Sequence, residues 1–290
     1  MNKQFGTGLI WFRRDLRTDD NAALCTALVQ CRQVFCVFVF DTDILDGLPK
    51  ADRRVEFIRE SLTGLDGDLR ALSGNPAAGL VVRHGRAVLD VVSLARELHV
   101  EAVFAAHDYE PTTQARDAKV RGALADAGIS FHVCKDQVVF EGREILTKTG
   151  TVYGVFTPYK NAWLARVDES CLRAHDVAAH ASALAARPEK YQKAVPTLAE
   201  IGFEATNLAT LKIPTGAAGA RQLFADFFER MDQYHETRDF PGAKGPSYLG
   251  VHLRFGTVSI RKLVGTALAR TIQGSQGAAV WLSELIWREF

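Results

Sequence analysis

Short apolar runs alternate with helical stretches over roughly the first 135 residues. Continuous apolar runs predict buried strands, and five of them occur, at residues 9–12, 34–40, 80–82, 102–105 and 129–133. The stretches between them predict helices at residues 21–29, 55–72, 88–98 and 115–127, the first capped by Asp20. In the second helix the apolar residues recur at steps of three and four, which places them on one face: Val55, Ile58, Leu62, Leu65, Leu69 and Leu72.

This alternation favours a parallel sheet with helices on both faces. Crossovers between parallel strands are right-handed, so the expected fold is a doubly wound α/β domain. We place a five-stranded domain of this kind at residues 1–135.

The rhythm changes after residue 135. Residues 138–146, with Gly142 near the centre, predict a small hairpin, and Thr157 before Pro158 predicts the start of a helix that runs through Trp163. Residues 168–222 are rich in alanine and polar residues and contain Pro188, Pro196 and Pro214, which indicates a long surface linker. Residues 136–220 are therefore expected to connect two domains.

From about Arg221 the pattern is helical to the end of the chain. It is still helical at Phe290, where neither a C-cap glycine nor a polar tail follows. We therefore expect residues 221–290 to be the incomplete N-terminal part of an all-helical domain, and the chain to be truncated on that side.

Composition narrows the class of protein. The chain has 290 residues, 47% of them hydrophobic and 24% charged, which excludes a disordered or fibrous chain. A net charge of +1 excludes a histone-like protein but permits a local basic groove for nucleic acid. Residues 1–8 contain no apolar stretch of signal-peptide length, and no apolar run approaches the roughly 20 residues of a membrane helix. The five cysteines form no CxxC pair, so we expect a cytoplasmic protein without disulfides, metal or membrane partner.

Common catalytic motifs are missing. The loop after the first strand has no glycine, which excludes a nicotinamide dinucleotide fingerprint, and no nucleophile–base–acid triad is evident. Three arginines in this loop, Arg13, Arg14 and Arg17, have two interpretations. They either hold a phosphate or carboxylate, or pair with Asp15, Asp19 and Asp20 at a domain contact.

Three stretches resemble the photolyase/cryptochrome family, and most nearly the bacterial class I cyclobutane pyrimidine dimer photolyases. They are residues 9–24 (LIWFRRDLRTDDNAAL), 155–163 (VFTPYKNAW) and 281–290 (WLSELIWREF); residues 238–241 and 252–256 add to the likeness. The resemblance covers the whole chain but only the first part of the family's length. It implies an antenna domain at residues 1–135 and the start of a helical FAD domain at residues 221–290.

The resemblance also implies an activity. Reduced FAD, excited by light, passes an electron to a pyrimidine dimer flipped out of the duplex, the ring splits, and the electron returns. The expected protein is thus a deoxyribodipyrimidine photo-lyase, a monomer whose partner is UV-damaged DNA.

Family positions that contact FAD match Tyr234, Trp281, Arg288 and a loop of five residues. The loop reads Pro246, Ser247, Tyr248, Leu249 and Gly250, where the family has Thr-Ser-Arg-Leu-Ser. Only Ser247 and Leu249 match, so two hydroxyls are lost while backbone donors for the FAD phosphates remain. The alternative is an ordinary turn before the next helix.

By resemblance, Arg238, Glu284 and Trp287 contact DNA. Glu284 and Trp287 are the expected catalytic pair: Glu284 bonds the flipped base or stabilises charge on the dimer, and Trp287 stacks on it. Trp281, Glu284 and Arg288 follow at i, i+3 and i+7 on one helix face, with Trp287 at its border. The alternatives are a surface ion pair of Arg238 with Asp239 or Glu236, and a plain core helix with a surface Glu–Arg pair.

The antenna chromophore stays open. Thr112 and Thr113 stand where folate-binding members carry an Asn–Glu pair, so folate is disfavoured and a deazaflavin, another flavin or an empty site remain. Because most of the flavin domain is missing, we expect the chain to bind FAD poorly and not to repair DNA alone. Two other hypotheses are a cryptochrome-like signalling flavoprotein and a non-catalytic α/β binding module with a mobile, vestigial tail.

Overall fold

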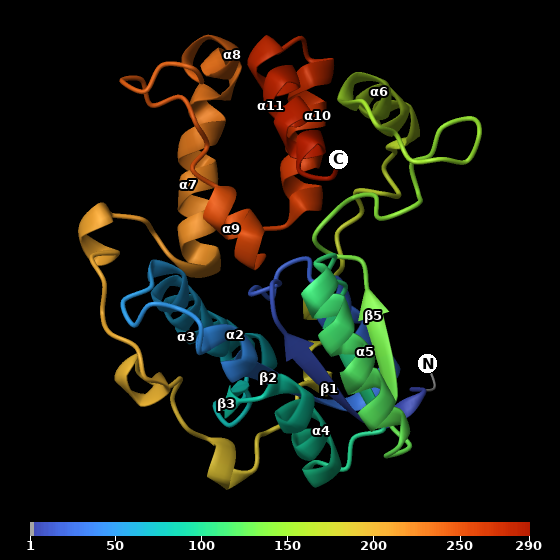
Figure 1. Cartoon of the computed structure of the whole chain (residues 1–290), viewed down its shortest axis with the longest axis vertical. Helices are drawn as coiled ribbons and strands as arrows, with labels where there is room; N and C mark the ends of the chain where they lie inside the picture. The colour runs from blue at the N-terminus through green and yellow to red at the C-terminus, as the bar shows by residue number, and fades with distance from the viewer. Residues whose placement is uncertain (1–2) are drawn as a thin grey trace.

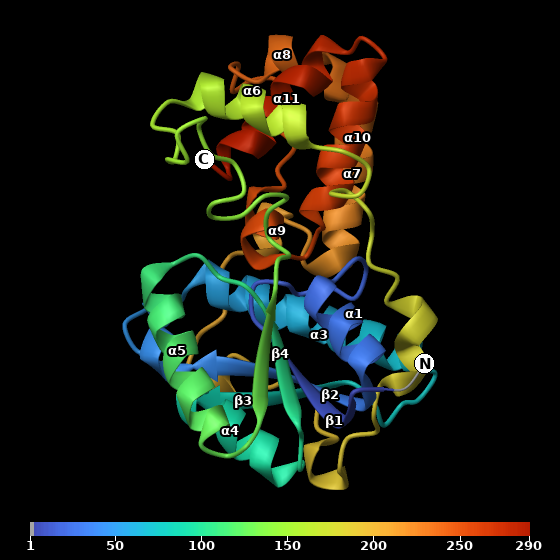
Figure 2. The same ribbon diagram turned by 90° about the vertical axis from the view of Figure 1, so that its right-hand side faces the viewer.

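The computed structural model describes residues 3–290, which form an α/β region below a helical region along the long axis of the molecule (Figures 1 and 2). The α/β region holds the five predicted strands. They are β1 (Phe5–Phe12), β2 (Cys31–Asp41), β3 (Leu80–Gly85), β4 (Ala102–Ala106) and β5 (Ser130–Cys134). All pair in parallel in the order β3-β2-β1-β4-β5, which confirms the doubly wound sheet.

Helices cover both faces of this sheet. Cores on its two faces hold residues of α1 (Ala22–Gln30) and α3 (Arg53–Ser73) on one side, and of α4 (Ala87–Glu97) and α5 (Pro111–Ala125) on the other. The short α2 (Thr42–Leu45) follows β2. Side chains alternate across β1, so Ile10 and Phe12 enter the first core while Leu9 and Trp11 enter the second. A strand buried on both faces must be apolar throughout, which is why the run was recognisable.

Asp20 is not the cap of α1, contrary to the prediction. Asn21 caps the helix, its side chain accepting a hydrogen bond from the Leu24 N–H at 2.8 Å. Asp20 lies in the left-handed region at φ 48°, and its carboxylate accepts bonds from Ser259 and Arg261 far along the chain. The acidic residue therefore joins the two regions.

The predicted hairpin at residues 138–146 is wrong. This segment forms turns, because the N–H groups of Val139 and Phe140 donate to the Glu289 carboxylate, at 2.5 and 3.3 Å, instead of to a second strand. Burial raises the pKa of Glu289 above its ordinary value. The helix after it, α6 (Phe156–Arg166), starts before Thr157 and has Val155 as its N-cap, without a side-chain cap.

The segment predicted as a surface linker is partly buried. It contains four short 3₁₀ turns, η1 (Ala178–Ala183), η2 (Glu189–Tyr191), η3 (Ala199–Ile201) and η4 (Ala209–Leu211). Val177, Leu184, Val195, Ile201 and Phe203 belong to the core on the α1–α3 face of the sheet. The segment thus completes that face.

The helical region has a core of its own. It comprises α7 (Gly216–Arg230), η5 (Met231–Gln233), α8 (Tyr234–Thr237), α9 (Gly250–Phe255), α10 (Ile260–Ile272) and α11 (Gln276–Trp287), joined by α6. Helix α7 begins at Gly216, so the helical pattern starts before the predicted position near Arg221. No helix between residues 3 and 290 has the length and apolar character of a membrane span.

A buried ion network joins the two regions. Arg261 of α10 bonds the carboxylates of Asp20 and Asp136, both at 2.9 Å, and Arg17 bonds Asp136 at 2.8 Å. These four side chains are at most 6% exposed. Burial disfavours the charged form of Asp136, but Arg17 and Arg261 more than offset it, so its pKa lies below its ordinary value.

The same junction captures the C-terminal end of α9. The last carbonyls of a helix lack partners within it. Here Arg254 O accepts from Arg14 Nε at 3.2 Å, Phe255 O from Leu16 N at 3.1 Å, and Gly256 O from Arg17 Nη1 at 3.0 Å. This packing argues against the α/β module with a mobile tail.

Candidate functional site

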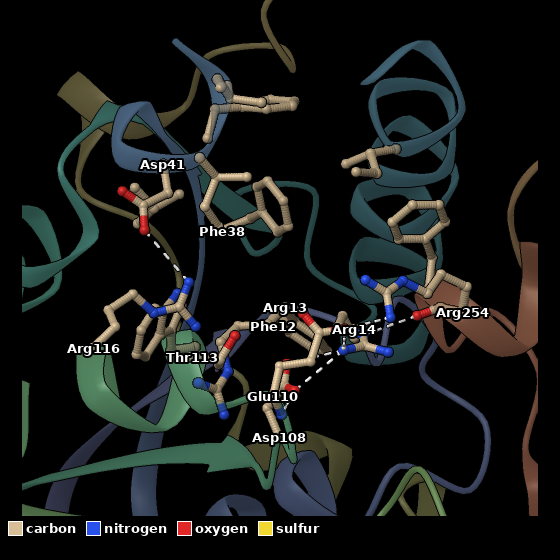
Figure 3. A pocket seen from close by; sticks show the side chains of 17 residues that line it. Phe12, Arg13, Arg14, Phe38, Asp41, Asp108, Glu110, Thr113, Arg116 and Arg254 are labelled. Atoms are coloured by element: carbon tan, nitrogen blue, oxygen red, sulfur yellow. Dashed lines mark hydrogen bonds and ion pairs between the residues drawn. The ribbon is translucent and has the colours of Figure 1, made fainter. Parts of the chain in front are cut away.

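A pocket of about 200 Å³ lies at the carboxyl ends of β1, β2 and β4, under the end of α9 (Figure 3). The strand order reverses direction between β1 and β4, because β2 and β3 follow on one side of β1 while β4 and β5 follow on the other. In doubly wound folds, ligands bind outside the carboxyl ends of the strands at such a switch point. The pocket is therefore at the place where this fold offers a binding site.

The inner wall of the pocket is apolar and largely aromatic. Phe12 ends β1, Phe38 and Phe40 come from β2, Ile58 from α3 and Phe255 from α9. These residues lie far apart in sequence and meet because the parallel strands end at one edge. Such a wall suits a flat, conjugated ring system.

The rim of the pocket is charged and internally paired. Arg13 Nη1 bonds the Asp117 carboxylate at 2.5 Å, and Arg14 Nη1 bonds Asp108 at 3.1 Å and Glu110 at 3.0 Å. Arg116 reaches Asp41 at 3.4 Å. Figure 3 shows the pair of Arg116 with Asp41 and the pairs of Arg14 with Asp108 and Glu110.

The three arginines after β1 therefore form ion pairs, which was one of the two interpretations of the sequence, but their partners differ from those predicted. Arg13, Arg14 and Arg17 pair with Asp117, Asp108 and Asp136 rather than with Asp15, Asp19 and Asp20. The nearby aspartates are used elsewhere: Asp15, for example, accepts the Arg13 backbone N–H at 2.8 Å. Burial, aided by the charge of Asp136, raises the pKa of Asp15 to about 6.

Two donors in the pocket wall have no acceptor among residues 3–290. They are Arg13 Nε and Arg116 Nε, both buried. Both guanidinium groups lie over the Trp11 ring, at 4.7 and 4.8 Å from its centroid. Both Nε atoms are covered by the chain itself, so neither donor is open to a ligand in the pocket.

The predicted flavin residues do not surround one cavity. Trp281 is 3% exposed and packs against Phe227, with ring centroids 4.7 Å apart, and Tyr234 is 8% exposed and packs edge-on against the same ring. Arg288 donates to the carbonyls of Gln137 and Leu253. As they lie here, Trp281 and Tyr234 serve the helical core.

The loop at residues 246–250 keeps donors available. Leu249 is buried, while Tyr248 is half-exposed at φ 58° and, with Gly250, lines a cavity of about 570 Å³ beside α7. The N–H groups of Ser247 and Tyr248 bond no atom of the described chain. Two free N–H groups fit an anionic group such as the diphosphate of FAD.

The predicted DNA residues lie at the surface near α8 and α11. Arg238 Nη1 bonds Glu284 Oε1 at 2.6 Å and Arg238 also reaches Asp239 at 3.4 Å, so the structure contains the surface ion pair that was one alternative. Trp287 is 49% exposed and stacks on Phe156, with centroids 3.8 Å apart and planes 14° from parallel. Sequence reasoning did not identify Phe156.

Comparisons with known proteins agree on one family. The family model described as DNA photolyase matches residues 8–188. The deoxyribodipyrimidine photo-lyase of Vibrio cholerae is 32% identical over 97% of this chain and 60% of its own length. A bacterial class III photolyase from Agrobacterium tumefaciens superposes with a TM-score of 0.81 at 26% identity, over 100% of this chain and 59% of its own.

An archaeal photolyase from Sulfolobus tokodaii, described with two FAD molecules and a light-harvesting cofactor, superposes with a TM-score of 0.64 at 26% identity. It is covered over 58% of its length and this chain over 98%. The chain thus spans about 60% of the length of the photolyases it matches.

Proposed function

This chain belongs to the DNA photolyase family, and from that premise we propose that it takes part in the light-dependent repair of cyclobutane pyrimidine dimers, as a deoxyribodipyrimidine photo-lyase acting on UV-damaged DNA. The support is the 32% identity to a photo-lyase over nearly the whole chain. Because the predicted flavin residues Trp281 and Tyr234 are buried in the helical core, we propose that this chain binds FAD weakly.

FAD, when bound, supplies the electron that splits the dimer. The residues of this chain bind the cofactor and the DNA and orient them. The free N–H groups of Ser247 and Tyr248 hold the diphosphate, and the buried Trp281 and Tyr234 keep α11 and α8 in place beside it. Arg238 exchanges its bond to Glu284 for a DNA phosphate, which frees Glu284 for the flipped base, and the exposed ring of Trp287 stacks on that base.

A duplex with one thymine dimer tests this role in DNA recognition. We expect the chain to bind it more tightly than the undamaged duplex, and Trp287→Ala to reduce that preference about tenfold, since a stacked base contributes roughly 1–3 kcal/mol. Fluorescence anisotropy measures both affinities. Ile272→Ala, which trims an exposed side chain of α10, is the control. A wild-type chain without dimer preference would contradict repair and favour the signalling alternative.

For the pocket at the sheet edge, we propose a light-harvesting chromophore of the flavin or deazaflavin class. The observation that carries this is an aromatic pocket at the topological switch point of the sheet. Thr113, which replaces the folate-binding carboxylate of the family pattern, lines the same pocket.

Filling this pocket should abolish chromophore binding. Thr113→Trp places an indole in the pocket, and we expect the affinity for FMN or a deazaflavin to fall at least about tenfold, measured by quenching of chromophore fluorescence. Thr112→Trp, the exposed neighbour outside the pocket, is the matched control. Equal binding by both variants, or tighter binding of a reduced folate than of any flavin, would contradict the assignment.

A further inference from the structure

Arg230, at the C-terminal end of α7, donates to three successive carbonyl groups of one loop. Its Nη1 lies 2.5 Å from Lys244 O and 2.7 Å from Gly245 O, and its Nη2 lies 2.8 Å from Pro246 O. These carbonyls immediately precede the loop at residues 246–250. The geometry and charge of a guanidinium, with five donors in one plane, allow it to collect several acceptors at once.

This contact determines where the next N–H group points. In a planar trans peptide, the C=O and the N–H point in opposite directions. Because the Pro246 carbonyl points at Arg230, the N–H of Ser247 in the same peptide points away from it. Gly245 already donates its N–H to Ala243 O at 2.8 Å, and proline has none. Ser247 and Tyr248 therefore carry the first free donors after the contact.

Neighbouring contacts hold both Arg230 and the loop in place. Asp226, one helical turn earlier, accepts from Arg230 at 3.2 Å and from Lys244 Nζ at 2.7 Å. The guanidinium lies over the ring of Tyr248, 5.9 Å from its centroid. A Cβ at Gly245 would overlap the carbonyl oxygen of Thr237, so the loop also packs closely on α8. The loop is thus fixed from two sides.

We infer that Arg230 is a positioning residue for the diphosphate of FAD. It turns three carbonyl oxygens away from the anion, and it presents the N–H group of Ser247 to it, with the free N–H group of Tyr248 next along the loop. The inference rests on the proposed function, because it takes the loop at residues 246–250 as the part of the chain that meets the cofactor. Arg230 itself touches the loop and not the ligand.

The test compares FAD with riboflavin, which carries the same ring system without the diphosphate. For Arg230→Met in the full chain we expect FAD affinity, measured by equilibrium dialysis, to fall about tenfold, the usual scale for hydrogen bonds to charged groups, while riboflavin affinity stays within about twofold. Arg230→Lys should recover part of the loss, because an ammonium reaches fewer carbonyls. Arg270→Met is the matched control, since Arg270 pairs with Asp232 and lies over the Phe228 ring without touching the loop.

A merely structural role for Arg230 would lower both affinities equally, and that result would overturn the inference. If the wild-type chain binds neither flavin, the proposal that this chain binds FAD is wrong. Amide hydrogen exchange then tests separately whether Arg230 holds the loop in place. Exchange at Ala243 and Gly245, whose N–H groups are hydrogen-bonded within the loop, that is about tenfold faster in Arg230→Met, with α10 unchanged, supports the positioning role. Unchanged exchange in the loop overturns it.

Discussion

Replacing Arg261 by methionine is expected to lower the free energy of unfolding by about 3–5 kcal/mol. Arg261 bonds the carboxylates of both Asp20 and Asp136, and all three side chains are almost fully buried. Without the guanidinium, Asp20 loses its cationic partner and Asp136 keeps only Arg17. The Asp20 carboxylate is then left buried without a cation, and an uncompensated buried charge is what makes breaking such a pair costly.

Urea unfolding followed by circular dichroism measures this loss. Lys262→Met is the matched control, because Lys262 is the next residue of α10, is half-exposed, and reaches Asp19 only at 4.0 Å. The control should change stability by less than about 0.5 kcal/mol. If both variants unfold at the same urea concentration as the wild type, the buried network does not stabilise the junction.

Gly256→Ala is expected to cost about 2–5 kcal/mol. Gly256 has φ 63°, a region that disfavours any side chain, and it follows α9 directly. An added Cβ would also overlap the carbonyl oxygen of Arg14 and the Cα of Asp15. The two regions of the chain would have to separate locally to admit one methyl group.

Gly274→Ala separates the two causes. Gly274 has φ 94°, but a Cβ there meets no atom within 4 Å. This variant therefore reports the backbone strain alone, about 1–2 kcal/mol, and the excess in Gly256→Ala reports the contact between regions. Thermal unfolding of both variants gives the difference. Equal losses of stability in the two variants would mean that the close contact at Gly256 relaxes without a cost in free energy.

The sheet was predictable because its signal is local. All five apolar runs are strands, since a parallel strand covered on both faces is apolar at every position. The face of α3 was recoverable for a similar reason: Val55, Leu62, Leu65 and Leu69 are buried. These patterns need no knowledge of the partner element.

The errors all involve partners that are remote in sequence. The hairpin prediction failed because Glu289 takes the N–H groups of Val139 and Phe140. The segment at residues 168–222 was predicted to be an exposed linker because no local pattern indicates its packing. In the structure, Leu184 forms an isolated parallel bridge with Val34. Aspartate is a favoured N-cap residue, yet the Asp20 carboxylate bonds Ser259 and Arg261 instead of the start of α1.

The candidate sites also show which residues can be predicted from the sequence and which contacts cannot. The resemblance supplied Arg238 and Glu284, which the structure brings together, and Trp287, which it leaves exposed. It also supplied Trp281, whose ring is in the core. The sequence named Arg13 and Arg14 as possible ligand contacts and Thr113 as an antenna position, but it did not predict that the three line one pocket at the sheet edge.

Because α9 lines the sheet-edge pocket, a ligand bound there can report whether the helical region is packed on the α/β region. Arg254 and Phe255 of this helix close one side of the pocket, and strand ends close the other. A bound fluorophore thus contacts both regions of the chain. Its emission will change when the two regions separate, so the separation can be compared in time with the unfolding of each region, without attaching a dye.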